Sequence, residues 1–308
     1  MTPRTARVRL GLVCALVVGA CAPAPSVTVE PSPSAAAAIA TPSIVPIPTP
    51  TSTPTATPTL PPSPSPSATP TATPTRVPTA PPASTVALIT HGSRDRRVIA
   101  LTFDADMTPL MRDQLKSGAV ASWYEERIVA TLRAEQVPAT IFLTGLWTQA
   151  YPDVVRSLAS DPLFELENHS VDHAAWRSPC YGLPAISTDT ARRNEVTGAA
   201  ATIRSIAGVD PTYFRFPGGC HSDSDLGLVA SLGELPLGWD TVSGDAFQSN
   251  PDVVVGDVMA RVRPGSIVVM HFIGAPNAPA TAVALERVIP MLRAQGYDFA
   301  TLRQLLAP

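Results

Sequence analysis

Strand-like and helix-like runs alternate along the chain from Arg97 onward, and this alternation constrains the fold more than any other feature. Runs rich in β-branched and aromatic residues predict strands at Arg97 to Asp104, Ala139 to Thr144, Phe164 to Glu167, Tyr213 to Phe216, Pro236 to Thr241, Ser266 to His271 and Asp298 to Thr301. Apolar residues at helical spacing predict helices at Tyr124 to Gln136, Tyr151 to Ala159, Thr188 to Ala207, Pro251 to Arg263 and Thr281 to Gln295, with a short helix after them. Such alternation is typical of parallel β/α units, so we expect an α/β fold.

The sequence before this region has a different composition. Residues 1–21 contain an apolar run from Leu10 to Ala20 that is too short to span a membrane, and small residues precede Cys21. This pattern predicts a lipoprotein-type signal peptide with a lipid anchor at Cys21; a cleaved signal with an incidental cysteine is the alternative. Residues 22–85 hold more than half of the chain's 35 prolines, together with Thr, Ser and Ala, which predicts a disordered Pro/Thr/Ser-rich tether.

Residues 86–308 are long enough for one domain with a sizeable core. The net charge is only -3 and there is no basic run, so we expect no nucleic-acid partner. A signal peptide implies export to the extracytoplasmic surface of the cell membrane. Removal of the signal and acylation of Cys21 would leave Cys180 and Cys220, an even pair that favours a disulfide over a zinc site.

Two of the five histidines stand four residues apart, at His169 and His173, directly after a predicted strand. On a helical turn this spacing places both imidazoles on one side, where they can bind a divalent metal ion such as zinc. Two surface histidines in a loop are the alternative interpretation.

Further polar residues stand where other predicted strands end. Asp104 and Asp106 follow the first strand, and Arg215, Asp245 and His271 occur at or near the ends of later ones. In a β/α barrel the carboxyl ends of the strands share one face, so these residues are expected to meet over one pocket. A metal, a base and an acid at one pocket are the equipment of metal-assisted hydrolysis.

The ordered segments TFDAD, HSVDH, RFPGG, WDTVSGD and VVMH resemble the five motifs of the polysaccharide deacetylases, carbohydrate esterase family 4, also called NodB-homology domains. The resemblance covers roughly Arg97 to Leu306 and implies a distorted (β/α) barrel. It also implies a hydrolase acting on carbon-nitrogen bonds other than peptide bonds, which uses a divalent metal, most simply zinc, to remove N-acetyl groups from amino sugars of a cell-wall or extracellular polysaccharide. Two alternatives stay open: a glycan-binding surface lipoprotein that has lost catalysis, and a carbohydrate esterase that cleaves acetyl esters. We expect a monomer.

The resemblance assigns a role to each matching residue. Asp104 matches the catalytic base, Arg215 the arginine that holds this base, and His271 the general acid that protonates the departing amine. Asp245 matches the acidic residue that tunes its charged neighbours.

The resemblance also implies a metal site and a pocket for the acetyl group. His169 and His173 match the two metal-binding histidines. The backbone N–H of Gly218 is expected to stabilise the oxyanion, and Val269 to face the acetyl methyl group.

Three positions depart from the family pattern. Ala105 stands where the family has a second aspartate as metal ligand, a tyrosine near Gly218 is missing, and Ala246 stands where a tryptophan is expected after Asp245. Asp106 lies two residues after Asp104 and can point the same way in an extended strand, so it is a candidate for the missing ligand. In the alternative, Asp106 caps the following segment and the two histidines bind the metal with solvent alone.

Overall fold

The computed structural model describes residues 86–307 of the 308-residue chain. The predicted signal peptide, the lipid anchor at Cys21 and the tether therefore lie outside the described residues. Within the described part, no helix has the length and apolar character that crossing a membrane requires.

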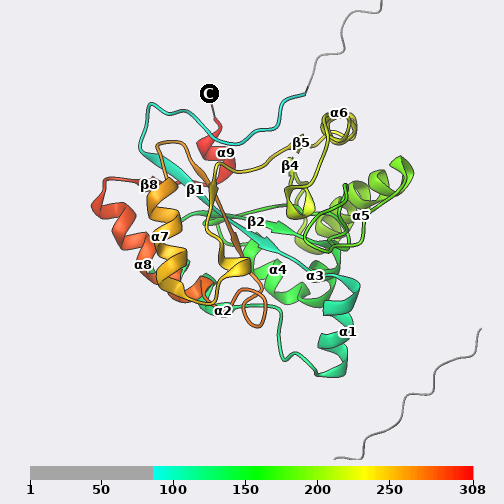
Figure 1. Cartoon of the computed structure of the whole chain (residues 1–308), viewed down its shortest axis with the longest axis horizontal. Helices are drawn as coiled ribbons and strands as arrows, with labels where there is room; N and C mark the ends of the chain where they lie inside the picture. The colour runs from blue at the N-terminus through cyan, green and yellow to red at the C-terminus, as the bar shows by residue number, and fades with distance from the viewer. Residues whose placement is uncertain (1–85, 308) are drawn as a thin grey trace, which may run out of the picture. The chain divides into compact units, whose positions relative to one another are not determined.

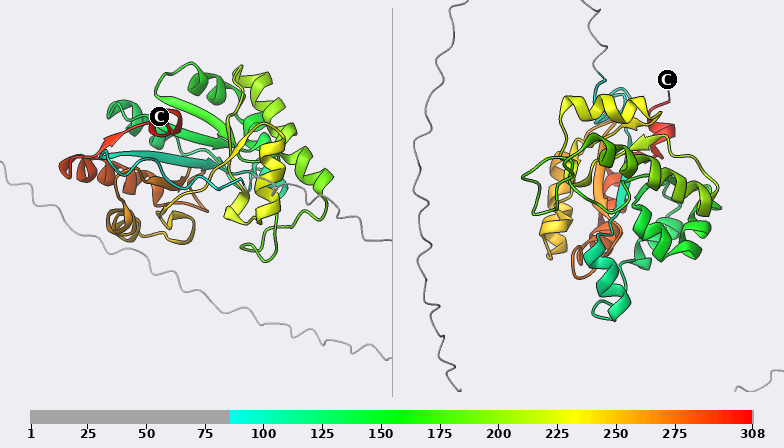
Figure 2. Two further views of the ribbon diagram at one scale, coloured as in Figure 1. Left: turned by 90° about the horizontal axis from the view of Figure 1, so that it is seen from above. Right: turned by 90° about the vertical axis from the view of Figure 1, so that its right-hand side faces the viewer.

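A curved parallel sheet forms the centre of the domain (Figures 1 and 2). Its strands are β1 Val98–Ala105, β2 Ala139–Leu143, β3 Phe164–Asn168, β4 Tyr213–Phe214, β5 Leu235–Pro236, β6 Thr241–Val242, β7 Ile267–His271 and β8 Asp298–Phe299. They lie in the order β5-β4-β3-β2-β1-β7-β6, and β8 pairs with the beginning of β1. All the strand pairs are parallel, and the sheet curls into a half-barrel, which confirms the predicted distorted (β/α) barrel.

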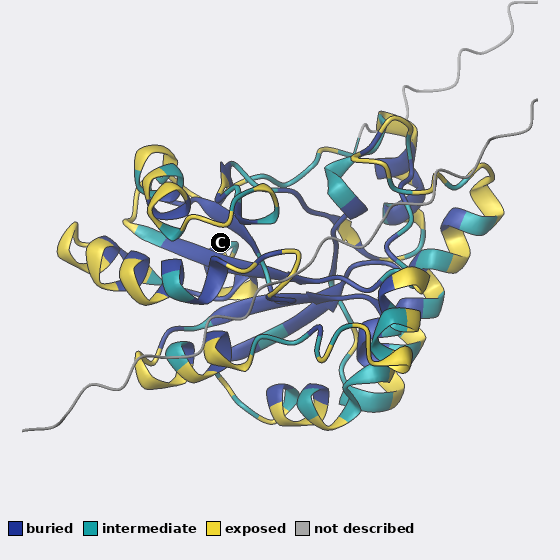
Figure 3. Cartoon of the chain, turned by 60° about the horizontal axis from the view of Figure 1, so that its bottom comes forward, coloured by how far each residue is buried: buried dark blue, intermediate teal, exposed yellow. Residues whose placement is uncertain are grey.

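Helices cover the outside of this sheet, as the exposed outer faces in Figure 3 show. They are α1 Pro109–Ser117, α2 Glu126–Ala134, α3 Gly145–Ala150, α4 Pro152–Ala159, α5 Asp189–Ala207, α6 Asp223–Ser231, α7 Pro251–Arg261, α8 Thr281–Ala294 and α9 Leu302–Leu305. Two 3-10 turns occur at η1 Pro217–Gly219 and η2 Asp245–Phe247. The sequence patterns do not predict α1, α3 and α6.

The strands have two different faces because their side chains alternate. In β1, the odd-numbered residues from Ile99 to Ala105 pack into the main core under the helices. The even-numbered residues face the inside of the half-barrel, where Ala100 packs with Phe142 and the polar Asp104 follows. The inner face of the sheet is thus apolar at its beginning and polar at its carboxyl edge.

The prediction of one strand from Pro236 to Thr241 is wrong. Pro236 belongs to β5 at one edge of the sheet and Thr241 to β6 at the opposite edge. The residues between them cross the open side of the half-barrel, where Leu237 bridges to Ile89. A segment that passes from one edge to the other cannot pair continuously with a single neighbouring strand.

Candidate active site

Asp104 and Asp106 lie on the same side of the end of β1, as expected for residues two apart in an extended chain. Register places Asp104 directly beside His271 at the end of β7. The next helix, α1, is capped by Thr108, whose side chain accepts a hydrogen bond from the N–H of Met111. This cap leaves the side chain of Asp106 for the pocket and does not support the capping alternative.

His169 and His173 do not lie on a helical turn, so this part of the prediction is wrong. They lie in the loop after β3, where Ser170 and His173 adopt positive φ angles of 73° and 60°. The hydroxyl of Ser170 accepts a hydrogen bond from the backbone N–H of His173, at 3.2 Å. The carboxylate of Glu195 in α5 accepts two further hydrogen bonds, from the N–H groups of Val171 and Asp172. A tight, hydrogen-bonded loop therefore brings the two imidazoles together.

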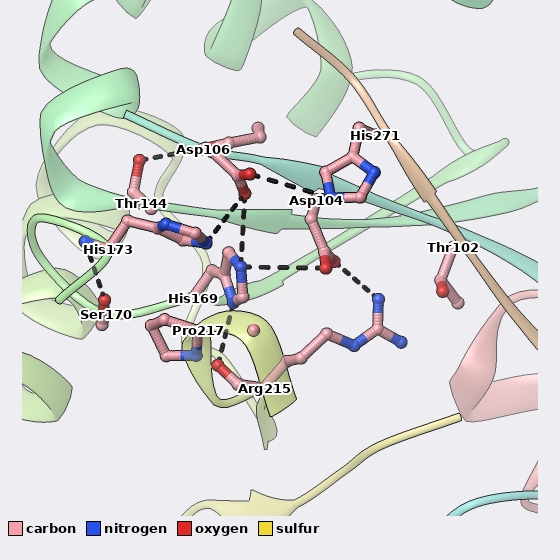
Figure 4. A network of polar contacts seen from close by, with 12 residues as sticks. Thr102, Asp104, Asp106, Thr144, His169, Ser170, His173, Arg215, Pro217 and His271 are labelled. Carbon is pink, nitrogen blue, oxygen red and sulfur yellow. Dashed lines mark hydrogen bonds and ion pairs between the residues drawn. The ribbon is translucent and has the colours of Figure 1, made fainter. Parts of the chain in front are cut away.

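Asp106, His169 and His173 converge as a possible metal site (Figure 4). Asp106 Oδ1 lies 3.3 Å from His169 Nε2 and 3.4 Å from His173 Nε2, and one ligand atom from each residue lies within 4.8 Å of the others. His169 Nδ1 lies 2.9 Å from the carbonyl oxygen of Arg215, which fixes the ring so that Nε2 faces the site. The three residues are buried.

Burial and the neighbouring charges shift the pKa values of these three residues in opposite directions. Burial lowers the pKa of His173 to about 4, so its imidazole is neutral at neutral pH, as metal binding requires. Burial would raise the pKa of Asp106, but the adjacent histidines lower it well below its usual range. Burial would lower the pKa of His169, but Asp104 and Asp106 raise it above the ordinary value. Asp104 and Asp106 therefore favour positive charge at His169, whereas burial keeps His173 neutral.

Asp104 forms a buried ion pair with Arg215 behind the cluster. Arg215 Nη1 donates to Asp104 Oδ1 at 2.6 Å, while Asp104 Oδ2 lies 3.7 Å from His169 Nε2. The guanidinium of Arg215 is completely buried and lies over the ring of Phe142, 3.9 Å from its centroid. Burial lowers the pKa of Arg215 despite Asp104, and such a charge is tolerated only because it is paired.

His271 and Asp245 form a second pair on the opposite side of Asp106. His271 Nδ1 lies 2.8 Å from Asp245 Oδ1, which leaves Nε2 to point into the cavity, 3.8 Å from Asp106 Oδ2. Burial opposes protonation, but Asp245 outweighs it and raises the pKa of His271 to about 10. Asp245 also accepts hydrogen bonds from the hydroxyls of Ser243 and Thr281. His271 is therefore an imidazolium ion at neutral pH and can donate a proton.

A cavity of about 540 Å³ opens above these groups, and Gly218 and Val269 both line it. Gly218 has a φ angle of 61°, and a Cβ atom there would lie 2.7 Å from the sulfur of Cys180, so only glycine fits. The structure contains the Cys180–Cys220 disulfide beside this glycine.

Sequence reasoning did not identify several residues at this site. Tyr181 and Phe247 line the cavity, and the hydroxyl of Thr281 holds Asp245. Proximity in sequence was the available signal for two of them, because Tyr181 follows Cys180 and Phe247 lies two residues after Asp245. Thr281 begins α8, and no motif marks it.

The fold and the site together define a class of protein. A carboxylate and two imidazoles converge at the carboxyl edge of a β/α half-barrel, between a carboxylate held by an arginine and an imidazolium held by a carboxylate. A base, an acid and metal ligands are what metal-assisted hydrolysis requires, so the fold and the site are those of a candidate metal-dependent hydrolase.

Known proteins with similar sequences point to one family within this class. Residues 91–234 match the family model described as polysaccharide deacetylase. The chain is 25% identical over 214 residues to a peptidoglycan-N-acetylglucosamine deacetylase of Bacillus cereus, covering 69% of this chain and 89% of that protein. It is 26% identical over 215 residues to a chitooligosaccharide deacetylase of Sinorhizobium fredii, covering 67% of this chain and 90% of that protein.

A solved structure shares the fold. It is a family 4 carbohydrate esterase pseudoenzyme from Bacillus anthracis, which matches with a TM-score of 0.59 and 23% identity over 72% of this chain and 69% of that chain. The family-model match and the curated relatives support a polysaccharide deacetylase of carbohydrate esterase family 4, as the five motifs indicate. The family-model match ends before β6, so it does not include Asp245 and His271.

Proposed function

We propose that the domain is a metal-dependent hydrolase that removes N-acetyl groups from amino sugars of a cell-wall or extracellular polysaccharide. It would act on a carbon-nitrogen bond that is not a peptide bond. The observation that carries this proposal is the convergence of three ligand atoms between two buried charge pairs at one cavity.

The residues present fit a divalent metal ion. Asp106 Oδ1 and His169 Nε2 are buried polar atoms without a hydrogen-bond partner among the described residues, which is costly unless a ligand binds them. One carboxylate and two imidazoles are a common protein donor set for catalytic zinc, so we propose zinc held by Asp106, His169 and His173. When bound, such an ion makes water more acidic and polarises a carbonyl group.

The chain's own groups supply the proton transfers. Asp104, held by Arg215, accepts a proton from the water molecule that adds to the acetyl carbonyl carbon. The carbon-nitrogen bond then breaks, and His271 Nε2 gives its proton to the departing nitrogen. The products are acetate and a glycan with a free amine.

The backbone and the apolar wall have supporting roles in this proposal. Gly218 lies at the cavity, where its N–H is available to the developing oxyanion. Val269 lines the same cavity and offers an apolar surface to the acetyl methyl group.

The relatives support an N-acetylated glycan as substrate, since two similar proteins are named for the deacetylation of peptidoglycan and of chitooligosaccharide. The second candidate is a glycan-binding protein without catalysis. Ala105 and the pseudoenzyme with the same fold favour this candidate. The position of Asp106 supports the enzyme, because it supplies the carboxylate that Ala105 lacks.

Acetate release tests the proposal. The full chain is incubated with N-acetylglucosamine oligomers, peptidoglycan and acetylated xylan, with and without a chelator. We expect acetate from an N-acetylated glycan, loss of activity with the chelator, recovery with zinc, and no activity in Asp104→Asn. A wild-type protein that binds these glycans and releases no acetate at any metal concentration would support the non-catalytic candidate. Release from xylan alone would indicate an esterase.

We further propose that the protein is exported and held as a monomer at the outer surface of the cell membrane through a lipid on Cys21. The apolar run before Cys21 and the Pro/Thr/Ser-rich composition of residues 22–85 support an anchor followed by a tether. Cys21→Ser should shift the protein from the membrane fraction to the soluble fraction and abolish labelling by a radioactive fatty acid. Unchanged labelling would contradict this anchor.

A further inference from the structure

We propose that Tyr181 and Phe247 form an aromatic platform at the mouth of the cavity, which binds a sugar ring adjacent to the sugar that carries the reacting acetamide. The inference rests on the proposed function and extends it: the substrate would be an uncharged oligosaccharide of more than one sugar.

Both rings of the aromatic platform are unusually exposed. Tyr181 and Phe247 are each 71% exposed, and their ring centroids lie 5.2 Å apart with the planes tilted by 42°. Both side chains line the cavity that also contains Asp104 and Asp106. Large apolar groups that gather at the rim of a cavity with polar groups at its base are typical of a ligand site.

Structural ties connect the platform to the catalytic groups. Tyr181 follows Cys180, whose disulfide to Cys220 encloses the η1 turn, and a Cβ atom on Gly218 would lie 3.1 Å from the Tyr181 ring. Phe247 ends the η2 turn that begins at Asp245. The ring of Tyr181 thus lies next to Gly218, and Phe247 lies two residues from Asp245, so a sugar on the platform would have a defined position relative to the reacting bond.

The platform lies near two motifs in which an expected aromatic residue is missing. No tyrosine follows Gly218 in its motif, yet the ring of Tyr181 reaches this glycine from the preceding loop. Ala246 follows Asp245, yet Phe247, one position later, lines the cavity. The chain thus supplies aromatic surface at both places from different positions.

The charges of the cavity favour an uncharged glycan. Its titratable lining residues, within the described part of the chain, are aspartate, histidine and tyrosine, and it contains neither lysine nor arginine. Arg215 lies buried behind the cluster, already paired with Asp104. The one cationic side chain among these lining residues is the imidazolium of His271, which is already paired with Asp245. A carboxylated or phosphorylated sugar would therefore meet Asp104 and Asp106 without an unpaired cation, whereas the apolar face of a neutral sugar ring can pack against an aromatic ring.

The experiment compares chain lengths of one substrate. The full chain carries Tyr181→Ala, Phe247→Ala or both, and acetate release is measured with N-acetylglucosamine oligomers of one to five sugars. Leu110→Ala is the matched control, because Leu110 is 68% exposed and does not line the cavity. We expect the double variant to lose about tenfold in kcat/KM on the pentamer, with little change on the monomer. Tyr181→Phe should retain the wild-type value.

A binding measurement separates the platform from the proposed chemistry. The affinity of Asp104→Asn for the N-acetylglucosamine pentamer is measured by calorimetry, with and without the two platform substitutions. Weaker pentamer binding in the platform variants supports the platform even if no protein releases acetate, in which case only the proposed activity falls. Acetate release that is equally fast without both rings overturns the platform and leaves the activity standing. A wild-type protein that neither binds nor deacetylates the pentamer also overturns the platform.

Discussion

Asp106→Asn is the most direct test of how this chain completes the proposed metal site. The substitution keeps the size of the side chain and removes its negative charge. Asp106 Oδ1 lies within 3.4 Å of both histidines, whereas Asp104 approaches only His169, at 3.7 Å. Loss of a residue that merely supports a metal ligand costs about 10- to 100-fold in affinity, so loss of the ligand itself should cost at least about 100-fold. This factor corresponds to about 2.7 kcal/mol of binding free energy.

Zinc affinity is measured by competition with a chromogenic chelator, and acetate release is measured in parallel. Asp106→Asn should lose both, and excess zinc should restore part of the activity. Asp104→Asn is the matched control, because the same chemical change two residues away affects a carboxylate held by Arg215. It should abolish turnover and change zinc affinity by less than about tenfold. Equal zinc affinity in Asp106→Asn and the wild type would refute the assignment of Asp106 as a ligand.

Moving the carboxylate to position 105 provides a second control. Ala105 is completely buried and packs in the main core on the other face of β1. The double variant Ala105→Asp/Asp106→Ala should therefore not bind zinc, although it matches the family motif more closely. A charged group without a partner in this core should lower the free energy of unfolding by about 3 kcal/mol or more, as measured by urea denaturation. Wild-type zinc affinity in this variant would show that the two faces of β1 are assigned wrongly.

Three further predictions concern stability. Arg215→Met should lower the free energy of unfolding by about 3 to 5 kcal/mol, because it leaves Asp104 buried without its partner. The double variant Asp104→Asn/Arg215→Met should cost less than the sum of the two single changes. Additive costs would contradict this coupling. Replacing Cys180 and Cys220 by serine should cost roughly 4 kcal/mol, given the separation of 40 residues, and two reactive thiols in the unfolded wild type would contradict the bond. Burial raises the pKa of Glu234 to about 8. The contribution of this group to stability is therefore complete below about pH 4.5 and is lost as the pH rises towards 8. Over this range the free energy of unfolding should fall by at most about 1.4 kcal/mol per pH unit. Glu234→Gln should therefore flatten the decrease of stability between pH 5 and 8, and an unchanged slope would mean that this carboxyl group titrates normally.

The sequence predicts the long elements of the fold because their periodicity is clear. Thr188 to Ala207 has helical spacing, and α5 spans nearly the same residues. The helix α3 escaped prediction for a physical reason. It has only six residues, and its N-cap hydrogen bond, which the N–H of Trp147 donates to the hydroxyl of Thr144, depends on the position of the chain after β2. The segment from Pro236 to Thr241 reads as one strand because local propensity contains no information about which edge of the sheet each end joins.

Much of the site could also be predicted, since the chemistry of a residue is visible in its type. Asp104 and His271 end strands that are adjacent in the sheet, and a parallel sheet brings such ends together. The convergence of His169 and His173 could be expected, but its cause could not: a spacing of four suggests a helical turn, and two positive φ angles replace it. Contacts made by exposed side chains, such as Tyr181 with Phe247, depend on loop positions that no local pattern encodes.

The register of β1 explains why an alanine stands between two aspartates. Ala105 pairs with Leu143 of β2, so the strand continues through this residue and its side chain must face the helices. An aspartate at this position would place a carboxylate in the apolar core, whereas positions 104 and 106 both face the inside of the half-barrel. Because β1 continues through residue 105, two carboxylates on the inner face must stand at positions 104 and 106 with an apolar residue between them. The sequence Asp-Ala-Asp meets this requirement. Asp106 offers a carboxylate to the same cluster from one residue further along the chain, so the absence of an aspartate directly after Asp104 is not by itself an argument against metal binding.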